Sequence, residues 1–306
     1  MDYRTIFTVS ALTLVLAACG DQPTTEAPSE TPPPADNPIE GFAETEDGVK
    51  IRYRLMGPSD APTIWVGYPW TDGWNEIMAE MGASGDEFSD SDPIKQLISK
   101  LTSRYQVLHV DYPRGTGGST GPLPGDLTPE TVAKDYVAVA DAAGVDRFVA
   151  MGYSWSAGFG IHVASRTKRC AGLVIGGWPV LGAPHEQIVG MSAANADALP
   201  PGPAKEVIGS NVIYYQSIID SNWDAEAAVD YMEDRAGLLY LYVGSEDNGV
   251  PGLGIPLPVA DPIIEHKEYL EAHGWWVEVI DGYDHMNLTL DAWLPSALAY
   301  LEGKTW

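Results

Sequence analysis

Basic side chains are scarce in this sequence. Its 306 residues include 17 lysines and arginines against 43 aspartates and glutamates, which gives a formal net charge of −26. A protein that binds nucleic-acid phosphates needs clustered basic side chains that release counterions, so the composition argues against nucleic acid as a partner. The acidic excess is typical of a well-solvated surface and identifies no ligand by itself.

Long apolar runs are also missing at the N-terminus, where the run over residues 6–16 is too short to span a membrane. It follows Arg4 and precedes small residues, which predicts a secretory signal. The segment LAAC, residues 16–19, resembles the bacterial lipobox. This resemblance implies removal of residues 1–18 and a lipid on Cys19. It predicts a membrane lipoprotein of the bacterial cell envelope, on the periplasmic or outer-membrane face. The alternative is an ordinary signal peptide cleaved nearby.

Cysteine is the scarcest of the reactive residues, because the chain holds only Cys19 and Cys170. With Cys19 taken by lipid, Cys170 has no partner and no disulfide is expected. Cys170 precedes an apolar strand pattern, GLVIGGW. We therefore expect a buried, inert thiol at this position rather than a catalytic one.

Residues 19–38 carry almost no large apolar side chain and are rich in proline, threonine and glutamate. Such a segment cannot bury enough apolar surface to offset its ordering entropy, so we expect a disordered tether. The folded domain is predicted to cover residues 39–306. The hydrophobic content of 45% is enough for the core of one large domain or two small ones.

Strand patterns recur through this domain. Asp47-Gly48 separates two segments, residues 42–46 and 49–55, and the second segment alternates apolar and polar residues. This pattern predicts a β-hairpin. Short apolar runs predict further strands at residues 63–67, 106–110, 147–151, 172–175, 238–243 and 275–280.

Helix patterns stand between these strands. Asp92-Pro93 and Thr128-Pro129 each combine an N-cap residue with a first-turn proline, and apolar residues at helical spacing follow both pairs. The second helix is expected to end at Gly144. Strands separated by helices predict an α/β fold, with a mostly parallel sheet and helices on both faces.

The stretch between Pro179 and Ala236 contains helical patterns, such as residues 206–219 and 225–232, and no strand pattern. An excursion of this length predicts a small helical cap, over about residues 180–236, above a site at the carboxyl edge of the sheet. Residues 71–92 either add to this cap or form a surface loop.

The segment VAMGYSWSAGFG, residues 149–160, holds two serines where a strand pattern gives way to a helix pattern. A sharp strand-to-helix turn that projects a nucleophile needs small residues two positions before and after it. Gly152 and Ser156 satisfy this requirement around Ser154, whereas Ser156 itself would lie inside the helix. We expect Ser154 to be the nucleophile and Ser156 to be only a tolerated small residue.

A serine needs a base, and His285 is the histidine that sits in a loop just past the last predicted strand. An acid that orients this histidine should follow another strand, as Asp247 does. Glu246, Asp281 and Asp284 are alternatives, and any of these acids could be a turn former instead. The order Ser154, Asp247, His285, each after a separate strand, is the informative feature.

From about Phe42 onward the chain resembles the α/β-hydrolase superfamily, in which nucleophile, acid and histidine follow this order. Gly67-Tyr68-Pro69 is similar to the family's oxyanion turn, and residues 111–119, DYPRGTGGS, resemble its Asp-x-Arg-Gly-x-Gly-x-Ser loop with one residue added. The sequence departs from the family at Val66, where histidine is frequent, and at Ser156, where glycine is usual.

The resemblance implies a serine hydrolase that cleaves a carboxylic ester or related acyl bond, with Ser154, His285 and Asp247 as its triad. The backbone N–H groups of Tyr68 and Trp155 would form the oxyanion hole. A small-molecule acyl substrate is expected, and no cofactor or metal. A substrate pocket biased toward apolar or aromatic groups is expected near three further tryptophans, Trp70, Trp178 and Trp223.

Two other functions stay open from the sequence. One is a serine peptidase of the proline-aminopeptidase type, which the Ser154-Trp155 pair resembles. The other is a non-catalytic envelope protein that uses the fold for binding. Epoxide and haloalkane chemistry on this fold uses an aspartate nucleophile, so a serine at position 154 argues against both reactions.

Overall fold

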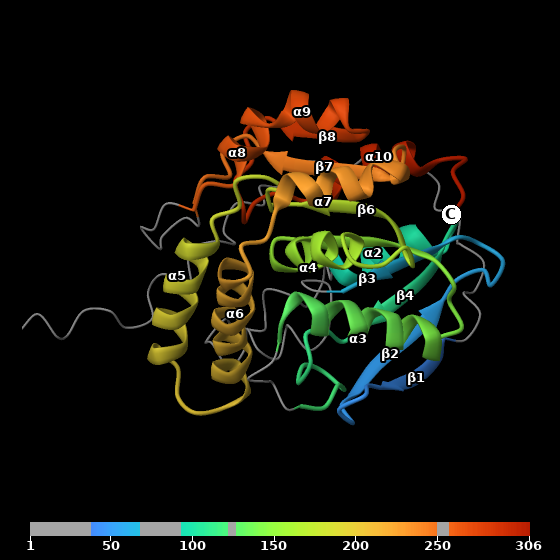
Figure 1. The fold of residues 1–306 in the computed structure, drawn as a ribbon. Helices are drawn as coiled ribbons and strands as arrows, with labels where there is room; N and C mark the ends of the chain where they lie inside the picture. Colours follow the sequence, from blue (N-terminus) through green and yellow to red (C-terminus); the bar gives the residue numbers. More distant parts are fainter. Residues whose placement is uncertain (1–37, 68–92, 122–126, 250–256) are drawn as a thin grey trace, which may run out of the picture.

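The computed structural model describes residues 38–67, 93–121, 127–249 and 257–306. These residues form an eight-stranded sheet with the strand order β1-β2-β4-β3-β5-β6-β7-β8 (Figure 1). The strands are β1 (Ile39–Glu44), β2 (Lys50–Met56), β3 (Thr63–Val66), β4 (Gln106–Val110), β5 (Phe148–Tyr153), β6 (Cys170–Gly176), β7 (Leu239–Gly244) and β8 (Trp275–Ile280).

Strand direction divides the sheet into an antiparallel edge and a parallel body. β1 pairs with β2 and β2 with β4 in antiparallel register, and every later pairing from β3 to β8 is parallel. All residues of β3, β6 and β7 are buried. Strands covered on both faces need apolar side chains at every position, which is why the sequence shows continuous apolar runs there.

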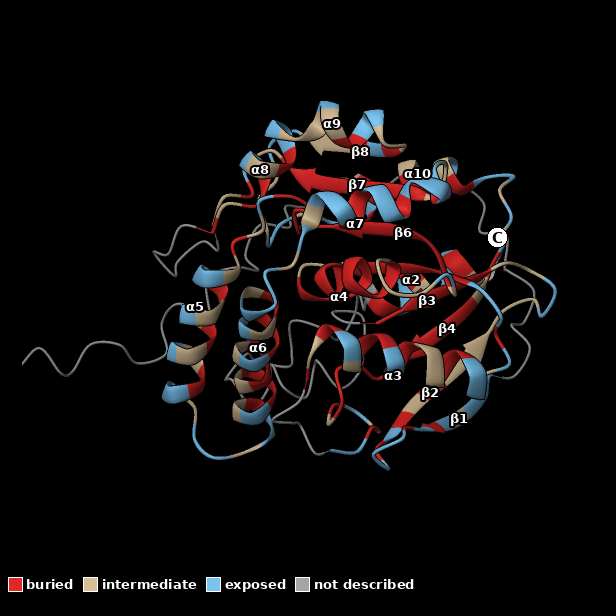
Figure 2. Cartoon of the chain, viewed as in Figure 1, coloured by how far each residue is buried: buried red, intermediate tan, exposed pale blue. Residues whose placement is uncertain are grey.

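Helices cover both faces of the sheet, whose central strands are buried (red in Figure 2). The apolar core accordingly falls into two clusters. Residues of α3, α4, α6 and α7 join the larger cluster, whereas α2 and α10 form the smaller one on the other face. The helices are α2 (Pro93–Thr102), α3 (Pro129–Ala142), α4 (Trp155–Ala164), α5 (His185–Ala198), α6 (Pro203–Asp220), α7 (Ala225–Met232), α8 (Ala260–Glu265), α9 (Lys267–Ala272) and α10 (Leu290–Leu301), with a 3₁₀ turn at Glu233–Arg235.

The sequence patterns located these elements well. The hairpin around Asp47-Gly48 is present, and β4 and β8 have the predicted bounds. Thr128 caps α3 because its hydroxyl accepts a hydrogen bond from the Thr131 N–H at 3.2 Å. β5 continues two residues past the predicted end, to Tyr153, because Tyr153 still pairs with β6. The predicted α/β fold with a mostly parallel sheet is confirmed.

The interval between β6 and β7, described throughout, contains helices and no strand, as the sequence predicts. α5 and α6 lie side by side beyond the end of the sheet toward which β7 points (Figure 1). α7 differs in position, because it lies over the sheet near β6 and β7 (Figure 1), where Val229 and Met232 join the larger core cluster. The interval 180–236 therefore holds a helix pair at the carboxyl edge and one helix on the sheet.

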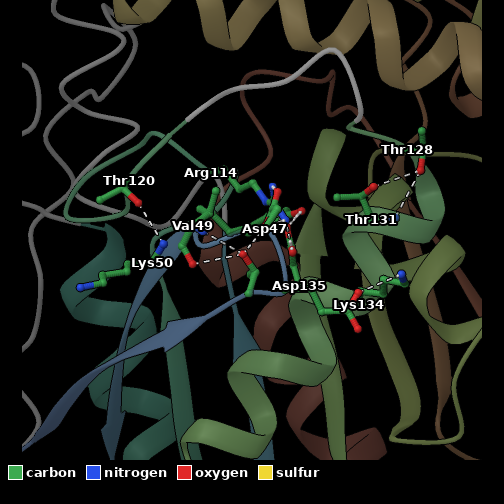
Figure 3. Close-up of polar contacts among 12 residues, drawn as sticks. Asp47, Val49, Lys50, Arg114, Thr120, Thr128, Thr131, Lys134 and Asp135 are labelled. Carbon is green, nitrogen blue, oxygen red and sulfur yellow. Dashed lines mark hydrogen bonds and ion pairs between the residues drawn. The ribbon is translucent and has the colours of Figure 1, made fainter.

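A buried ionic group stabilises the loop after β4. Arg114 donates to both carboxylate oxygens of Asp135, at 2.7 and 2.6 Å, and to the carboxylate of Asp47 in the β1–β2 turn (Figure 3). The Tyr112 hydroxyl adds a hydrogen bond of 3.0 Å to Asp135. We call Asp47, Tyr112, Arg114 and Asp135 the Arg114 cluster. It ties the loop resembling the family's arginine motif to α3 and to the hairpin.

The Arg114 cluster pairs one guanidinium with two carboxylates. The side chains of Arg114 and Asp135 are 3% and 1% exposed. Burial raises the pKa of the Asp135 carboxyl, although the hydrogen bonds and charge of Arg114 act in the opposite direction. Burial also acts to raise the pKa of Asp47, but the hydrogen bonds from Arg114 and Thr45 outweigh it and lower that pKa. Ions removed from water persist only with such pairing.

Candidate active site

Ser154 stands at the turn between β5 and α4. Its backbone has φ 55° and ψ −120°, a conformation that L residues rarely adopt. The Ser154 N–H donates to the Gly176 carbonyl of β6 at 2.8 Å, which holds the turn against the neighbouring strand. A Cβ atom on Gly152 would lie 2.6 Å from Ser156 Oγ and 2.9 Å from its backbone. Only glycine therefore permits this tight crossing, and strain of this kind concentrates at reactive sites.

Three side chains from three strand ends meet at this turn. His285 Nε2 lies 2.9 Å from Ser154 Oγ, and His285 Nδ1 lies 3.0 Å from each carboxylate oxygen of Asp247. A carboxylate can only accept, so Nδ1 carries the proton and Nε2 accepts from the serine hydroxyl. Asp247 is fully buried, while the His285 side chain is 9% exposed. The hydrogen bonds thus run in one direction from Ser154 to Asp247.

The alternative acids have other contacts. The Asp284 carboxylate accepts from the backbone N–H groups of Met286 and Asn287, at 2.8 and 3.0 Å, and so shapes the turn that carries His285. Asp281 accepts from the Ser245 hydroxyl at 3.3 Å. Glu246 is exposed. Of the four acids that the sequence left open, Asp247 is the one hydrogen-bonded to His285 in the structure.

The remaining histidines lie elsewhere. His109 is buried in β4, and His266 and His273 border α9. His162 lies inside α4, where burial and the nearby positive charge of Arg166 lower its pKa well below the usual value. His185 begins α5, and burial lowers its pKa to about 4. Both imidazoles are neutral packing groups near neutral pH.

The structure describes only some of the residues predicted for the oxyanion hole and the substrate pocket. Trp155 is the first residue of α4, so its backbone N–H belongs to a helix N-terminus, where amide groups point toward incoming negative charge. Tyr68, Trp70 and the lipidation candidate Cys19 lie outside the described residues.

Two of the predicted pocket tryptophans lie between α4 and the α5–α6 pair. The Trp178 ring stacks on Tyr215 at 5.2 Å and lies 6.1 Å from His185. Trp223 lies 4.3 Å from the His162 ring. These contacts place both tryptophans in packing that joins the helix pair to α4, and their part in binding a substrate stays a prediction.

Two hydroxyl groups near the turn have contacts that spacing alone did not reveal. The expectation that Ser156 is only a tolerated small residue is wrong, because its hydroxyl accepts from the Tyr153 N–H at 3.0 Å and lies 3.2 Å from the Tyr153 carbonyl. The Tyr153 hydroxyl donates to the backbone carbonyl of His285 at 2.8 Å. A serine where the resemblance leads one to expect glycine was the one available signal.

The chemistry available elsewhere is limited. Within residues 38–67, 93–121, 127–249 and 257–306, no group of three or more histidine, cysteine, aspartate or glutamate side chains could hold a metal ion. Cys170 is buried in β6, and burial raises the pKa of its thiol to about 11. The predicted burial of Cys170 is confirmed, and the raised pKa disfavours the thiolate, which is the reactive form.

Comparison with known proteins extends this description. No protein-family model matches the sequence. A protein of Klebsiella variicola (strain At-22) named "Putative carbamate hydrolase RutD" is 36% identical over 133 residues, or 43% of this chain and 46% of that protein. The chain thus spans less than half the length of the curated relatives it matches.

Solved structures resemble the chain over most of its length. The enol-lactonase from Burkholderia xenovorans LB400 has a TM-score of 0.57 at 17% identity, covering 85% of this chain and 99% of its own. An alpha/beta hydrolase from Novosphingobium aromaticivorans DSM 12444 has a TM-score of 0.54 at 16% identity, covering 86% and 96%. At such identities the likeness concerns the fold, and the chain has the α/β-hydrolase fold that the sequence motifs predict.

Proposed function

We propose that this chain of α/β-hydrolase fold is a serine hydrolase that cleaves a carboxylic ester or a related acyl bond. The observation that carries the proposal is the hydrogen-bonded chain from Ser154 Oγ through His285 to Asp247, at 2.9 and 3.0 Å. Its members come from the ends of β5, β7 and β8. A neutral serine is a poor nucleophile, and an adjacent base held by an acid is the arrangement that activates it.

In the proposed reaction, Ser154 Oγ attacks the substrate carbonyl carbon while its proton passes to His285 Nε2. The Asp247 carboxylate stabilises the imidazolium that forms and holds the ring through Nδ1. The backbone N–H group of Trp155 donates to the oxyanion, together with that of Tyr68 if the resemblance to the family's oxyanion turn holds. Collapse of the tetrahedral adduct expels the alcohol, which takes the proton from His285. Water activated by the same histidine then releases the acid and regenerates Ser154.

A carbamate is the second candidate substrate, because the partial relatives from Klebsiella carry the name of a carbamate hydrolase. Carbamates have a less electrophilic carbonyl than esters, but attack by serine proceeds through the same kind of tetrahedral adduct. The peptidase alternative would require recognition of a free amino group. We rank ester first because the proposed machinery is sufficient for it, and carbamate second.

Labelling with a fluorophosphonate probe tests the class. Such a probe phosphonylates an activated serine, so wild-type protein should gain one adduct, on Ser154. Ser154→Ala should lose both labelling and turnover. Ser165→Ala is the matched control, since its hydroxyl donates to the His162 carbonyl and accepts from the Arg166 side chain at the end of α4. An adduct on Ser156, or turnover surviving in Ser154→Ala, would show that another residue is the nucleophile.

A substrate panel separates the candidates. An aryl ester and an O-aryl carbamate that release the same phenol, and a proline arylamide that releases the corresponding arylamine, can be compared by kcat/KM. We expect the ester to be turned over fastest and the proline arylamide slowest. Faster turnover of the proline arylamide would favour the peptidase, and a protein that is neither labelled nor active on any of the three would favour the non-catalytic binding protein.

We also propose that a lipid on Cys19 anchors the mature chain to a membrane of the bacterial envelope. The support is the lipobox-like segment and the composition of the tether that follows. Within the part of the chain that the structure describes, no helix has the length and apolar character to cross a membrane. Cys19→Ser should move the protein from the membrane to the soluble fraction. Unchanged fractionation of Cys19→Ser would refute lipid anchoring.

A further inference from the structure

Tyr153 bridges the two halves of the proposed active site. It immediately precedes Ser154 at the end of β5, and its phenol hydroxyl donates to the backbone carbonyl of His285 at 2.8 Å. Ser154 and His285 are joined again by the 2.9 Å hydrogen bond between their side chains. Two hydrogen bonds therefore cross between the same two loops. One lies within the proposed reaction path, and the other lies outside it.

The backbone of Tyr153 is held from the other side. Its N–H donates to the Ser156 hydroxyl at 3.0 Å, and Ser156 is 5% exposed. Ser156 belongs to the first turn of α4, so this bond fastens the helix to the last residue of the strand across Ser154. The strained φ of 55° at Ser154 needs such support, because an unsupported turn would relax toward ordinary backbone angles.

The Tyr153 ring sits in a slot of fitting shape. It lies 5.1 Å from the His285 ring and 6.0 Å from the Tyr242 ring, centre to centre. A Cβ atom on Gly177 would approach two Tyr153 ring atoms to 2.7 Å, so glycine leaves the room that the ring fills. Gly177 has φ +63°, which also suits glycine. The phenol is thus aimed at the His285 carbonyl by packing on several sides.

We propose that Tyr153 is a positioning residue, which couples the Ser154 turn to the His285 loop through its hydroxyl while Ser156 fixes its backbone. The catalytic consequence rests on the proposed function. The mechanical consequence does not, because it concerns only how firmly the His285 ring is held beside Ser154 and Asp247. Removing the phenol hydroxyl should loosen the loop that carries His285 and leave the substrate pocket unchanged.

The test compares two identical changes at neighbouring rings. Tyr153→Phe removes the bridging hydroxyl, whereas Tyr242→Phe removes a buried hydroxyl for which the described residues provide no hydrogen-bond partner. With an aryl ester, Tyr153→Phe should lower kcat and the rate of fluorophosphonate labelling by about fivefold to tenfold, with KM within about twofold. Tyr242→Phe should stay within about twofold of wild type. Equal effects of the two variants, or a change confined to KM, would overturn the proposal.

A spectroscopic measurement keeps the proposal testable whatever the activity. The proton on His285 Nδ1 in the hydrogen bond to Asp247 should give a downfield NMR signal, whose exchange with water reports how well the ring is held. We expect exchange about fivefold faster in Tyr153→Phe and unchanged in Tyr242→Phe. If wild type is unreactive toward the probe, the proposed function fails, and this signal alone decides: faster exchange supports coupling and equal exchange refutes it.

A second variant covers a folding defect in Tyr153→Phe. Ser156→Ala keeps the phenol but removes the bond on the Tyr153 N–H. It should also lower kcat at unchanged KM and speed the exchange of the His285 Nδ1 proton. If Ser156→Ala matches wild type in both measurements, Ser156 does not fix the Tyr153 backbone and the coupling as proposed is wrong.

Discussion

The Arg114 cluster and the Ser154–His285–Asp247 chain are both polar groups that join loops around one sheet, but they use their polar atoms in opposite ways. Arg114 donates to two carboxylates, and its side chain is 3% exposed. Ser154 is partly exposed, and its single hydroxyl is directed at a base. The Arg114 cluster pairs opposite charges, whereas the second group holds the Ser154 hydroxyl beside a proton acceptor, His285 Nε2.

This difference has an energetic basis. A buried ion is tolerated when opposite charge and hydrogen bonds compensate it, and Arg114 directs its hydrogen bonds to Asp135 and Asp47, which holds these loops together. The group of Ser154, His285 and Asp247 instead has a strained backbone at Ser154 and an accessible hydroxyl oxygen. These features do not stabilise the fold, but they suit a nucleophile. Substitutions in the two groups should therefore have separable effects, on stability in one and on turnover in the other.

The largest expected effect is on catalysis. Asp247→Asn should lower kcat/KM by about 10⁴-fold while the melting temperature changes little, because an amide favours the wrong imidazole tautomer. His285→Ala should lose at least as much. Glu246→Gln is the matched control, since it changes the exposed neighbour and should keep activity. Enzyme kinetics with thermal unfolding on the same samples make the measurement. If Glu246→Gln lost activity instead, Glu246 rather than Asp247 would be the acid that orients His285.

The next effect is on folding. Asp135→Asn leaves the buried guanidinium of Arg114 short of a counter-charge and should lower the free energy of unfolding by about 3 kcal/mol. Activity per folded molecule should stay within about threefold of wild type. Glu130 lies on the same helix as Asp135 and forms an ion pair with Arg166 near the surface. Glu130→Gln breaks this pair and should lower the free energy of unfolding by about 0.5 kcal/mol. Denaturant titration distinguishes the two, and equal losses would contradict the contrast between buried and exposed pairs.

A smaller effect is expected with pH at His185, a partly buried imidazole. Burial lowers the pKa of His185 to about 4, whereas an unfolded histidine titrates near about 6.5. Below about pH 6.5 the unfolded chain therefore binds more protons than the folded one, and stability falls as pH falls toward 4. We expect His185 to account for a loss of about 1–2 kcal/mol between pH 7 and pH 5.

Unfolding titrations at pH 7 and pH 5 measure this dependence. His185→Gln should lose less stability between the two pH values than wild type does. His266→Gln, which removes an imidazole bonded to the Pro262 carbonyl on α8, controls for the loss of one ring and should keep the wild-type difference. If His185→Gln keeps the full difference, the pH dependence arises elsewhere.

The smallest effect tests the second serine. Ser156→Gly removes the hydroxyl that fastens Tyr153 and should lower kcat by about threefold to tenfold, a change of up to about 1.4 kcal/mol in the barrier. Ser156→Val should be worse, since a branched side chain would crowd Gly152. Steady-state kinetics on the aryl ester give both values. A Ser156→Gly protein as inactive as Ser154→Ala would assign Ser156 a direct part in the reaction.

Local patterns determined much of this protein in advance. Apolar runs in β3, β6 and β7 and the Thr128-Pro129 cap identified the elements, because burial on both faces and helix starts leave short-range marks. The order Ser154, Asp247, His285 predicted a common location, since the carboxyl ends of parallel strands share one edge of the sheet.

Tertiary structure alone selected among equivalent residues. Four acids followed strands in the sequence, and only the path of the loops brought the carboxylate of Asp247, rather than that of Asp284, into a hydrogen bond with the His285 imidazole. Sequence spacing also gave no sign of two hydrogen bonds around Ser154. The Ser156 hydroxyl accepts from the Tyr153 N–H, and the Tyr153 hydroxyl donates to the His285 carbonyl. Hydrogen bonds need donor–acceptor distances of about 3 Å, within a few tenths of an ångström, and sequence spacing does not encode such distances.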